Sequence, residues 1–174
     1  MHLRLIGPAA TQLDQVFMTD WYLVSTKLLE AIERPKSYAK QPVSNELVQI
    51  VAGGPDDDFP VLEQTYFSMI NMAKDYIYIQ TPYFIPDPSF YDAIRIATLS
   101  GIDVRIMIPN KPDHPFVYWA TYSYAGQMLR AGARVFIYDN GFLHTKMIVI
   151  DDEASTVGTA NIDVRSFKLN FEVN

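Results

Sequence analysis

Apolar residues recur along the chain in two patterns, and each pattern predicts a different secondary structure. Where they return at helical spacing, with Leu13, Phe17, Tyr22 and Leu28 among the apolar positions of one stretch, the pattern predicts a helix. Pro88 opens one such helix, and Gly101 and Gly132 stop two of them. The predicted helices cover residues 9–30, 59–74, 88–101 and 114–131.

Short runs of apolar and β-branched residues lie between these helices and predict β-strands. Glycine and proline end several of the runs, as at Gly7-Pro8 and Pro109. Residues 34–45 are polar and contain two prolines, so they predict a connecting loop. The predicted strands cover residues 2–6, 47–52, 76–79, 104–108, 134–138, 142–150, 155–157 and 169–173.

Strands that alternate with helices predict the α/β class. We expect a mixed, largely parallel β-sheet with helices on both faces, because the last strands follow one another through short turns. A chain of 174 residues suits one domain, expected over residues 1–174. A strand predicted at the very start and another at the very end suggest a domain cut from a longer protein on both sides.

The charge of the chain narrows the choice of partners. Its formal net charge is -6, so the surplus of Lys and Arg that nucleic-acid phosphates usually require is absent, and we expect no nucleic-acid partner. There are no cysteines and only three histidines, so a metal site is weakly suggested at most. The longest apolar runs, such as residues 147–150, are far shorter than the ~20 residues of a membrane-spanning helix.

The pair His144 and Lys146 is the first candidate for chemistry. Both residues fall in the strand predicted over 142–150, where alternate residues share a face, so their side chains should lie roughly 6–7 Å apart along it. A lysine is rarely buried without a partner, and a bound phosphate would supply one. The alternative is a solvated strand end, which an isolated His-x-Lys pair by itself favours.

Further polar candidates lie after one of the next two predicted strands and within the other. Thr159 and Asn161 stand on a loop opened by Gly158, where the backbone can approach a ligand closely. Glu172 lies on the polar face of the strand predicted over 169–173. The alternative for that strand is an edge position with its polar face in water.

Together these residues match a known signature. His-x-Lys-x4-Asp, then Gly-[Ser/Thr]-x-Asn, then Glu eleven residues after the Asn is similar to the signature of the phospholipase D superfamily. The resemblance covers the whole chain, and the strings at residues 81–86, 140–144, 158–167 and 170–174 resemble bacterial cardiolipin synthases, in their C-terminal half. The residues that match the signature are His144, Lys146, Asp151, Gly158, Thr159, Asn161 and Glu172.

The resemblance implies a role for each of these side chains. His144 would be one of two paired histidines, of which one attacks phosphorus and the other protonates the leaving alcohol. Lys146 and Asn161 would bind phosphate oxygens and stabilise the transition state, and Thr159 would donate a hydrogen bond nearby. Glu172 would orient an imidazole.

Asp151 belongs to the same signature and is therefore counted among the catalytic residues. Strand parity, however, places its side chain on the face opposite His144. We accordingly expect Asp151 to support the structure without touching the substrate.

The implied reaction transfers a phosphatidyl group between two phosphatidylglycerol molecules through a phosphohistidine, without a metal ion or other cofactor. Family members of this kind carry two signatures, whereas this chain has one His-x-Lys pair. The expected partner is therefore an N-terminal half that carries the other signature, or a second copy of the chain in a homodimer. The isolated chain should be inactive or nearly so.

The resemblance also implies a membrane surface as a partner. The full-length protein is expected at the bacterial cell membrane, and this fragment is expected to be soluble. Aromatic residues at 83–85 and 116–124 fit a membrane interface, although packing in the core explains them equally well. Two other functions stay open: a phosphodiesterase or nuclease of the same superfamily, and a non-catalytic binding half.

Overall fold

The computed structural model describes residues 3–29, 46–111 and 115–174, in two compact units that comprise residues 1–50 and 51–174. The sequence predicted a single domain over residues 1–174, which stays a prediction, and the two units are described separately below. The predictions for His2, for the loop at 34–45 and for a helix start at His114 lie outside the described residues. In the described part, no helix is long and apolar enough to cross a membrane.

The first unit contains one helix, α1 (Pro8–Ser25), none of whose residues is buried. Pro8 occupies its first turn, where a missing N–H does no harm. The helix ends earlier than the predicted residue 30, because Thr26 adopts the left-handed conformation with φ of 56°. Residues 3–6 form no strand, which corrects the prediction for 2–6 as far as those residues are described.

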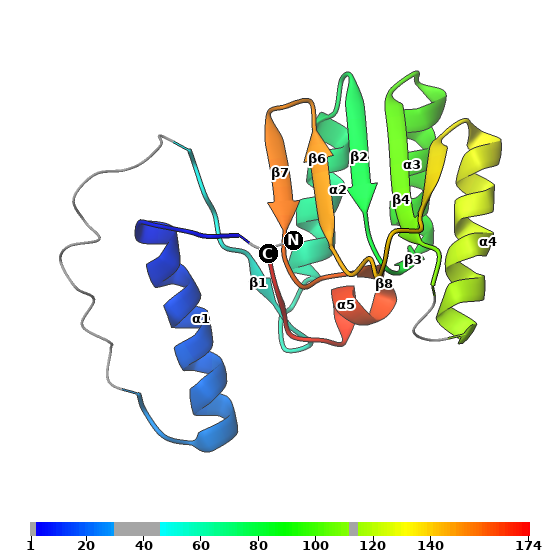
Figure 1. The fold of residues 1–174 in the computed structure, drawn as a ribbon. Coiled ribbons are helices and arrows are strands. Elements are labelled where there is room, and N and C mark those ends of the chain that lie inside the picture. Colours follow the sequence, from blue (N-terminus) through cyan, green and yellow to red (C-terminus); the bar gives the residue numbers. More distant parts are fainter. Residues whose placement is uncertain (1–2, 30–45, 112–114) are drawn as a thin grey trace. The chain divides into compact units, whose positions relative to one another are not determined.

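The second unit is built on a five-stranded mixed sheet in the order β5-β4-β2-β6-β7 (Figure 1). The strands β2, β4 and β5 are parallel, whereas β6 and β7 run antiparallel to their neighbours. The mixed α/β class predicted from the sequence is thus confirmed. The strands are β2 (Tyr76–Gln80), β4 (Asp103–Pro109), β5 (Arg134–Tyr138), β6 (Met147–Ile150) and β7 (Ala154–Val157).

Two short strand pairs and four helices complete this unit. The strand β1 (Ala52–Gly53) pairs antiparallel with β9 (Glu172–Val173), and β3 (Phe84–Ile85) pairs parallel with β8 (Ile162–Asp163). The pairing of β3 with β8 was not predicted. The helices are α2 (Val61–Met72), α3 (Pro88–Leu99), α4 (Pro115–Ala131) and α5 (Val164–Lys168).

The core lies between one face of the sheet and the helices α2, α3 and α4. Alternate residues of the strands, such as Ile77 and Ile106, are fully buried in one cluster with Tyr66 of α2 and Phe90 of α3. The opposite face is half-exposed and carries the stacked rings of Tyr76 and Tyr78. The sequence predicted helices on both faces of the sheet. Within the described residues of this unit, the helices α2, α3 and α4 pack on one face.

Three predicted strands are shorter in the structure. Residues 142–146 do not join β6, because β2 ends at Gln80, the partner of Met147, and the chain after it continues into Pro82, which has no N–H to donate. Residues 169–171 do not join β9, because the N–H groups of Leu169 and Asn170 donate to the Arg165 carbonyl at the end of α5. Of the strand predicted over 47–52, only Ala52 lies in a strand, paired with Val173 of β9, although Val51 also exchanges backbone hydrogen bonds with Asn174.

A buried acidic pair joins three helices of the second unit. Lys168 of α5 lies 3.7 Å from Glu63 of α2 and 3.3 Å from Asp87, the N-cap residue of α3. Burial, followed by the hydrogen bond with Asp87, raises the pKa of Glu63 to about 7. Burial works against the charge of Asp87 as well, but hydrogen bonds from Glu63 and from the Phe90 N–H outweigh it and lower that pKa to about 2. The pair therefore shares one proton, held by Glu63.

Replacing Glu63 by Gln should make the stability of the chain less dependent on pH. Because folding raises the pKa of Glu63, its contribution is complete below about pH 4.5 and is lost as the pH rises through about 7. The amide of Glu63→Gln can donate to Asp87 at every pH, so the loss between pH 5 and 8, on the order of 2 kcal/mol, should disappear. Urea unfolding across this range measures it, and Glu153→Gln, at an exposed turn, is the control. An unchanged pH profile in Glu63→Gln would contradict the shared proton.

Candidate active site

The candidate site lies at the edge of the sheet where β2 ends and β6 begins. Lys146 directly precedes β6, and only 8% of it is exposed. It lines a small hollow together with Thr81, Ala160 and Ile162. His144 is exposed, two residues earlier on the same segment. The edge thus combines a buried cation with an accessible imidazole.

The amine of Lys146 contacts His144 directly. Its Nζ lies 3.0 Å from Nδ1 and 3.3 Å from Nε2 of the ring, and it donates to the His144 carbonyl at 2.9 Å. The separation of 6–7 Å expected from strand geometry is replaced by this contact, because residues 142–146 are not in a regular strand. An ammonium group only donates, so the ring nitrogen that faces it must be unprotonated. This contact favours the neutral imidazole, the form that can act as a nucleophile.

The ring of His144 also contacts Phe142, two residues earlier on the same segment. It stacks on Phe142, with 5.4 Å between the ring centroids and 16° between the planes. Phe142 itself is largely exposed. The stacking limits the rotation of the imidazole at an otherwise open edge.

Asn161 carries a buried polar atom without a partner. Its Oδ1 makes no hydrogen bond within the described residues, while its Nδ2 lies 3.4 Å from Ser166 Oγ. Its neighbours Ala160 and Ile162 line the hollow beside Lys146. Turning the amide over would let Oδ1 accept from Ser166 and would free the NH₂ group to donate to an anion. A buried orphan of this kind marks an incomplete site.

Thr159 and Glu172 act locally in the structure. The Thr159 hydroxyl oxygen accepts from the Val173 N–H at 2.9 Å, so Thr159 holds β9 in place. Glu172 accepts from Asn170 Nδ2 at 3.1 Å. The roles expected for Thr159 toward substrate and for Glu172 toward an imidazole stay predictions.

Two residues that sequence reasoning did not select hold this part of the site together. The Tyr66 hydroxyl donates to the Ala160 carbonyl at 3.2 Å and accepts from Asn174 Nδ2 at 2.6 Å. Asn174 also donates to Thr156 at 2.9 Å and accepts from the Ala160 N–H at 3.3 Å. Burial raises the pKa of Tyr66, so it stays a neutral donor. In the sequence Tyr66 is one apolar residue of a helix, and no spacing indicates its partner 108 residues away.

Gly158 is required where β7 leads into this segment. A Cβ atom on it would lie 2.3 Å from the Val173 carbonyl oxygen, far closer than a real contact allows. The close approach at this glycine is to the backbone of β9 and to Asn174, and the expected approach to a ligand stays a prediction.

Asp151 lies at the opposite end of β6 from Lys146, roughly 13–17 Å along the strand. Its carboxylate accepts from three backbone N–H groups, those of Lys74 at 2.6 Å, Asp75 at 3.0 Å and Tyr76 at 2.7 Å. The structure thus separates Asp151 from the other signature residues and uses it to hold the start of β2. Its place in the catalytic set stays a prediction, while the structural role expected from strand parity fits these contacts.

Replacing Asp151 by Asn should lower the thermal stability of the chain and leave any activity of the site at Lys146 close to wild type. Hydrogen bonds from the backbone, that of Tyr76 first, lower the pKa of Asp151, so its contribution is present above the pKa of an unfolded Asp and is lost on acidification. Asn tolerates the left-handed backbone at φ of 51° but accepts with one oxygen only. Melting curves at pH 7 and pH 3 measure the effect, with Asp58→Asn as an exposed control. A large loss of turnover with unchanged melting would support the catalytic role instead.

The aromatic residues near this edge divide into two groups. Phe84 is fully buried, whereas 81% of Phe116 and 70% of Trp119 are exposed. Tyr118 and Tyr122 are half-buried and line a second hollow at the same edge. No group of three His, Cys, Asp or Glu residues suited to a metal ion occurs among the described residues.

Solved structures identify the fold as that of the phospholipase D family. The phospholipase D family member Nuc of Salmonella typhimurium matches 72% of this chain and 79% of its own, with a TM-score of 0.59 and 21% identity. The phosphatidylserine synthase of Haemophilus influenzae matches 91% of this chain and 46% of its own, with a TM-score of 0.60 and 19% identity. At these identities the likeness concerns the fold alone.

The sequence comparisons narrow the assignment. The PLD-like domain of cardiolipin synthases matches residues 66–174. The major cardiolipin synthase ClsA of Bacillus subtilis is 57% identical to this chain, and the cardiolipin synthase of Oceanobacillus iheyensis is 54% identical. Each match covers 99% of this chain and 36% of the relative. The chain therefore belongs to the PLD-like family of cardiolipin synthases, and it spans about a third of the length of these relatives.

Proposed function

We propose that this chain supplies one half of the active site of a phospholipase D-type phosphatidyltransferase, which joins two phosphatidylglycerol molecules into cardiolipin. The observation that carries the proposal is the buried Lys146 amine in contact with the His144 imidazole. Beside it, the residues flanking Asn161 line the same hollow. A cation, a nucleophile and an amide at one edge suit a phosphodiester, whose charge must be balanced while phosphorus is attacked.

The reaction would proceed in two displacements. In the first, a histidine nitrogen attacks phosphorus, the bond from phosphorus to the glycerol oxygen breaks, and the paired histidine protonates that oxygen. In the second, the hydroxyl oxygen of another phosphatidylglycerol attacks phosphorus, the N–P bond breaks, and the paired histidine takes up the hydroxyl proton. Lys146 and Asn161 would stabilise the extra negative charge on the phosphate oxygens in both steps.

One half-site contains one histidine of the required pair. The other would come from an N-terminal half with its own His-x-Lys pair, which the greater length of the relatives can accommodate, or from a second copy in a homodimer. The isolated chain would be inactive, because it lacks either the nucleophile or the acid. The full-length protein would work at the surface of the bacterial membrane, where its substrate lies.

The test is an assay of the full-length protein with labelled phosphatidylglycerol in mixed micelles, run in parallel with labelled single-stranded DNA. The expected products are labelled cardiolipin and free glycerol, with no DNA cleavage. DNA cleavage without lipid turnover would instead identify a nuclease of the same superfamily. Absence of both activities in a folded full-length protein would favour a non-catalytic binding half.

A further inference from the structure

The backbone that carries Asn161 is held on both sides of Ala160, which is fully buried. The Ala160 carbonyl belongs to the same peptide group as the Asn161 N–H, and it accepts from the Tyr66 hydroxyl at 3.2 Å. The Ala160 N–H, in the preceding peptide group, donates to Asn174 Oδ1 at 3.3 Å. The Asn161 amide has a long contact of its own, 3.4 Å from Nδ2 to Ser166 Oγ. Its direction therefore depends on the backbone that Tyr66 and Asn174 hold.

Asn174 connects these two contacts. Its Nδ2 donates to the Tyr66 hydroxyl at 2.6 Å and to Thr156 Oγ1 at 2.9 Å. A backbone N–H can only donate, so the atom of the Asn174 amide that faces Ala160 must be the oxygen, and the NH₂ group then faces the two hydroxyls. Because the Tyr66 oxygen accepts from Asn174, its own proton is available for the Ala160 carbonyl. Asn174 thus sets the direction of the hydrogen bonds in this network.

The backbone of Asn174 is held independently of its side chain. Its N–H donates to the Val51 carbonyl and its carbonyl accepts from the Val51 N–H, both at 2.9 Å. One residue earlier, the Val173 carbonyl accepts from the Thr159 N–H at 2.9 Å. A change confined to the side chain of Asn174 can therefore disrupt the network while these backbone hydrogen bonds keep β9 in place.

We propose that Asn174 is a positioning residue of the phosphatidyl transfer, which acts through Tyr66 and Ala160 to hold the Asn161 amide toward the phosphate. The inference rests on the proposed function and deepens it, because it names a residue outside the signature on which the reaction depends. An amide at 174 offers one acceptor and two donors, whereas a carboxylate offers acceptors only. In Asn174→Asp the Tyr66 proton would turn to the carboxylate, and the Ala160 carbonyl would lose its partner.

A double-mutant cycle of Asn174→Asp and Asn161→Ala in the full-length protein tests this role, with kcat and KM measured for cardiolipin formation. Asn174→Asp by itself should lower kcat about tenfold and change KM less than about twofold, because Asn161 stabilises charge that develops during attack. In the Asn161→Ala background the same change should lower kcat less than about twofold, since the group that it positions is gone. A tenfold loss in both backgrounds would overturn the proposal, because a smaller folded fraction lowers both rates equally.

Asn71→Asp is the matched control for the exchange of an amide for a carboxylate. Asn71 is exposed on α2, where its Nδ2 donates to the Phe67 carbonyl at 2.8 Å. This variant should keep the wild-type kcat. A tenfold loss in Asn71→Asp would attribute the effect to the added charge and would count against the network.

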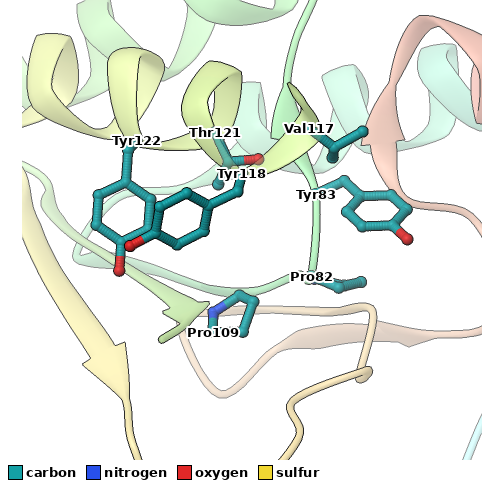
Figure 2. A pocket seen from close by; sticks show the side chains of 7 residues that line it. All are labelled: Pro82, Tyr83, Pro109, Val117, Tyr118, Thr121 and Tyr122. Carbon is teal, nitrogen blue, oxygen red and sulfur yellow. The ribbon is translucent and has the colours of Figure 1, made fainter. Parts of the chain in front are cut away.

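Tyr66→Phe removes the middle link of the network and should show the same dependence on Asn161. Its control is Tyr122→Phe, which removes a tyrosine hydroxyl from α4 at the same edge of the sheet. Tyr122 is half-buried, with 4.3 Å between the centroids of its ring and that of Tyr118 (Figure 2). Equal losses in Tyr66→Phe and Tyr122→Phe would contradict a specific role for the network.

Absence of turnover in the wild-type protein would overturn the proposed function and not the positioning, so the order of the Asn161 amide is measured separately. Nitrogen relaxation by NMR on this chain gives the order parameter of the side-chain amide. It should fall in Asn174→Asp and keep the wild-type value in Asn71→Asp. An unchanged order parameter in Asn174→Asp would overturn the positioning role, even if kcat fell.

Discussion

Lys146→Met in the full-length protein should lower kcat for cardiolipin formation by about a hundredfold or more. The amine is buried at the sheet edge and contacts His144 at 3.0 Å. In the proposed mechanism, its loss removes the charge that stabilises the phosphate oxygens during attack. Removing one preorganised donor to a developing negative charge typically costs about 10²–10³ in kcat. Met retains the length of the side chain and suits the apolar hollow, so the fold should survive the change.

The control separates a loss of charge at the site from a loss of charge in general. Lys74→Met removes an exposed lysine at the far end of the sheet and should leave kcat unchanged. His144→Ala should abolish turnover as well, since in the proposed mechanism His144 either forms the N–P bond or protonates the leaving alcohol. Wild-type turnover in His144→Ala would show that this half of the protein binds substrate without performing chemistry.

Tyr66→Ala should destabilise this chain by about 3–5 kcal/mol, the range for truncating a large buried aromatic residue. Tyr66 is 1% exposed and packs edge-to-face against Phe167, with 5.7 Å between the ring centroids. Tyr66→Phe keeps the ring but leaves the Ala160 carbonyl and the Asn174 amide without their partner, so about 1–3 kcal/mol should be lost. Urea unfolding with a constant m-value measures both changes.

Phe67→Ala is the matched control, because Phe67 is the next residue of α2 and is 40% exposed. It should cost about 0.5 kcal/mol or less. A cost for Phe67→Ala as large as that for Tyr66→Ala would mean that the helix, and not the buried contact, accounts for the effect. In the full-length protein, Tyr66→Phe should also lower kcat, since the Tyr66 hydroxyl holds the backbone next to Asn161.

The local pattern of the sequence was sufficient for the elements that carry the core. Six elements have ends within two residues of the predicted bounds: the helices α2, α3 and α4 and the strands β2, β4 and β5. The spacing of their apolar residues predicts one type of secondary structure for each, because each element buries a single face against the others. The signature residues were also visible in the sequence, since the resemblance depends on their identity and spacing and not on contacts.

Tertiary structure alone decided how these residues are used. Residues 142–146 read as strand, yet β2 ends at Gln80, so this segment leaves the ladder and the Lys146 amine meets the imidazole of His144. Asp151 belongs to the signature, but only the register of β6 against β2 brings it under three backbone N–H groups.

By itself, the sequence determined the α/β class, the family and the chemical groups of the half-site, because periodicity and residue identity are local properties. Which groups meet, as Tyr66 meets Asn174 across 108 positions, depends on strand register and on helix packing. Those are set by the burial of the whole core, which no short stretch of sequence contains.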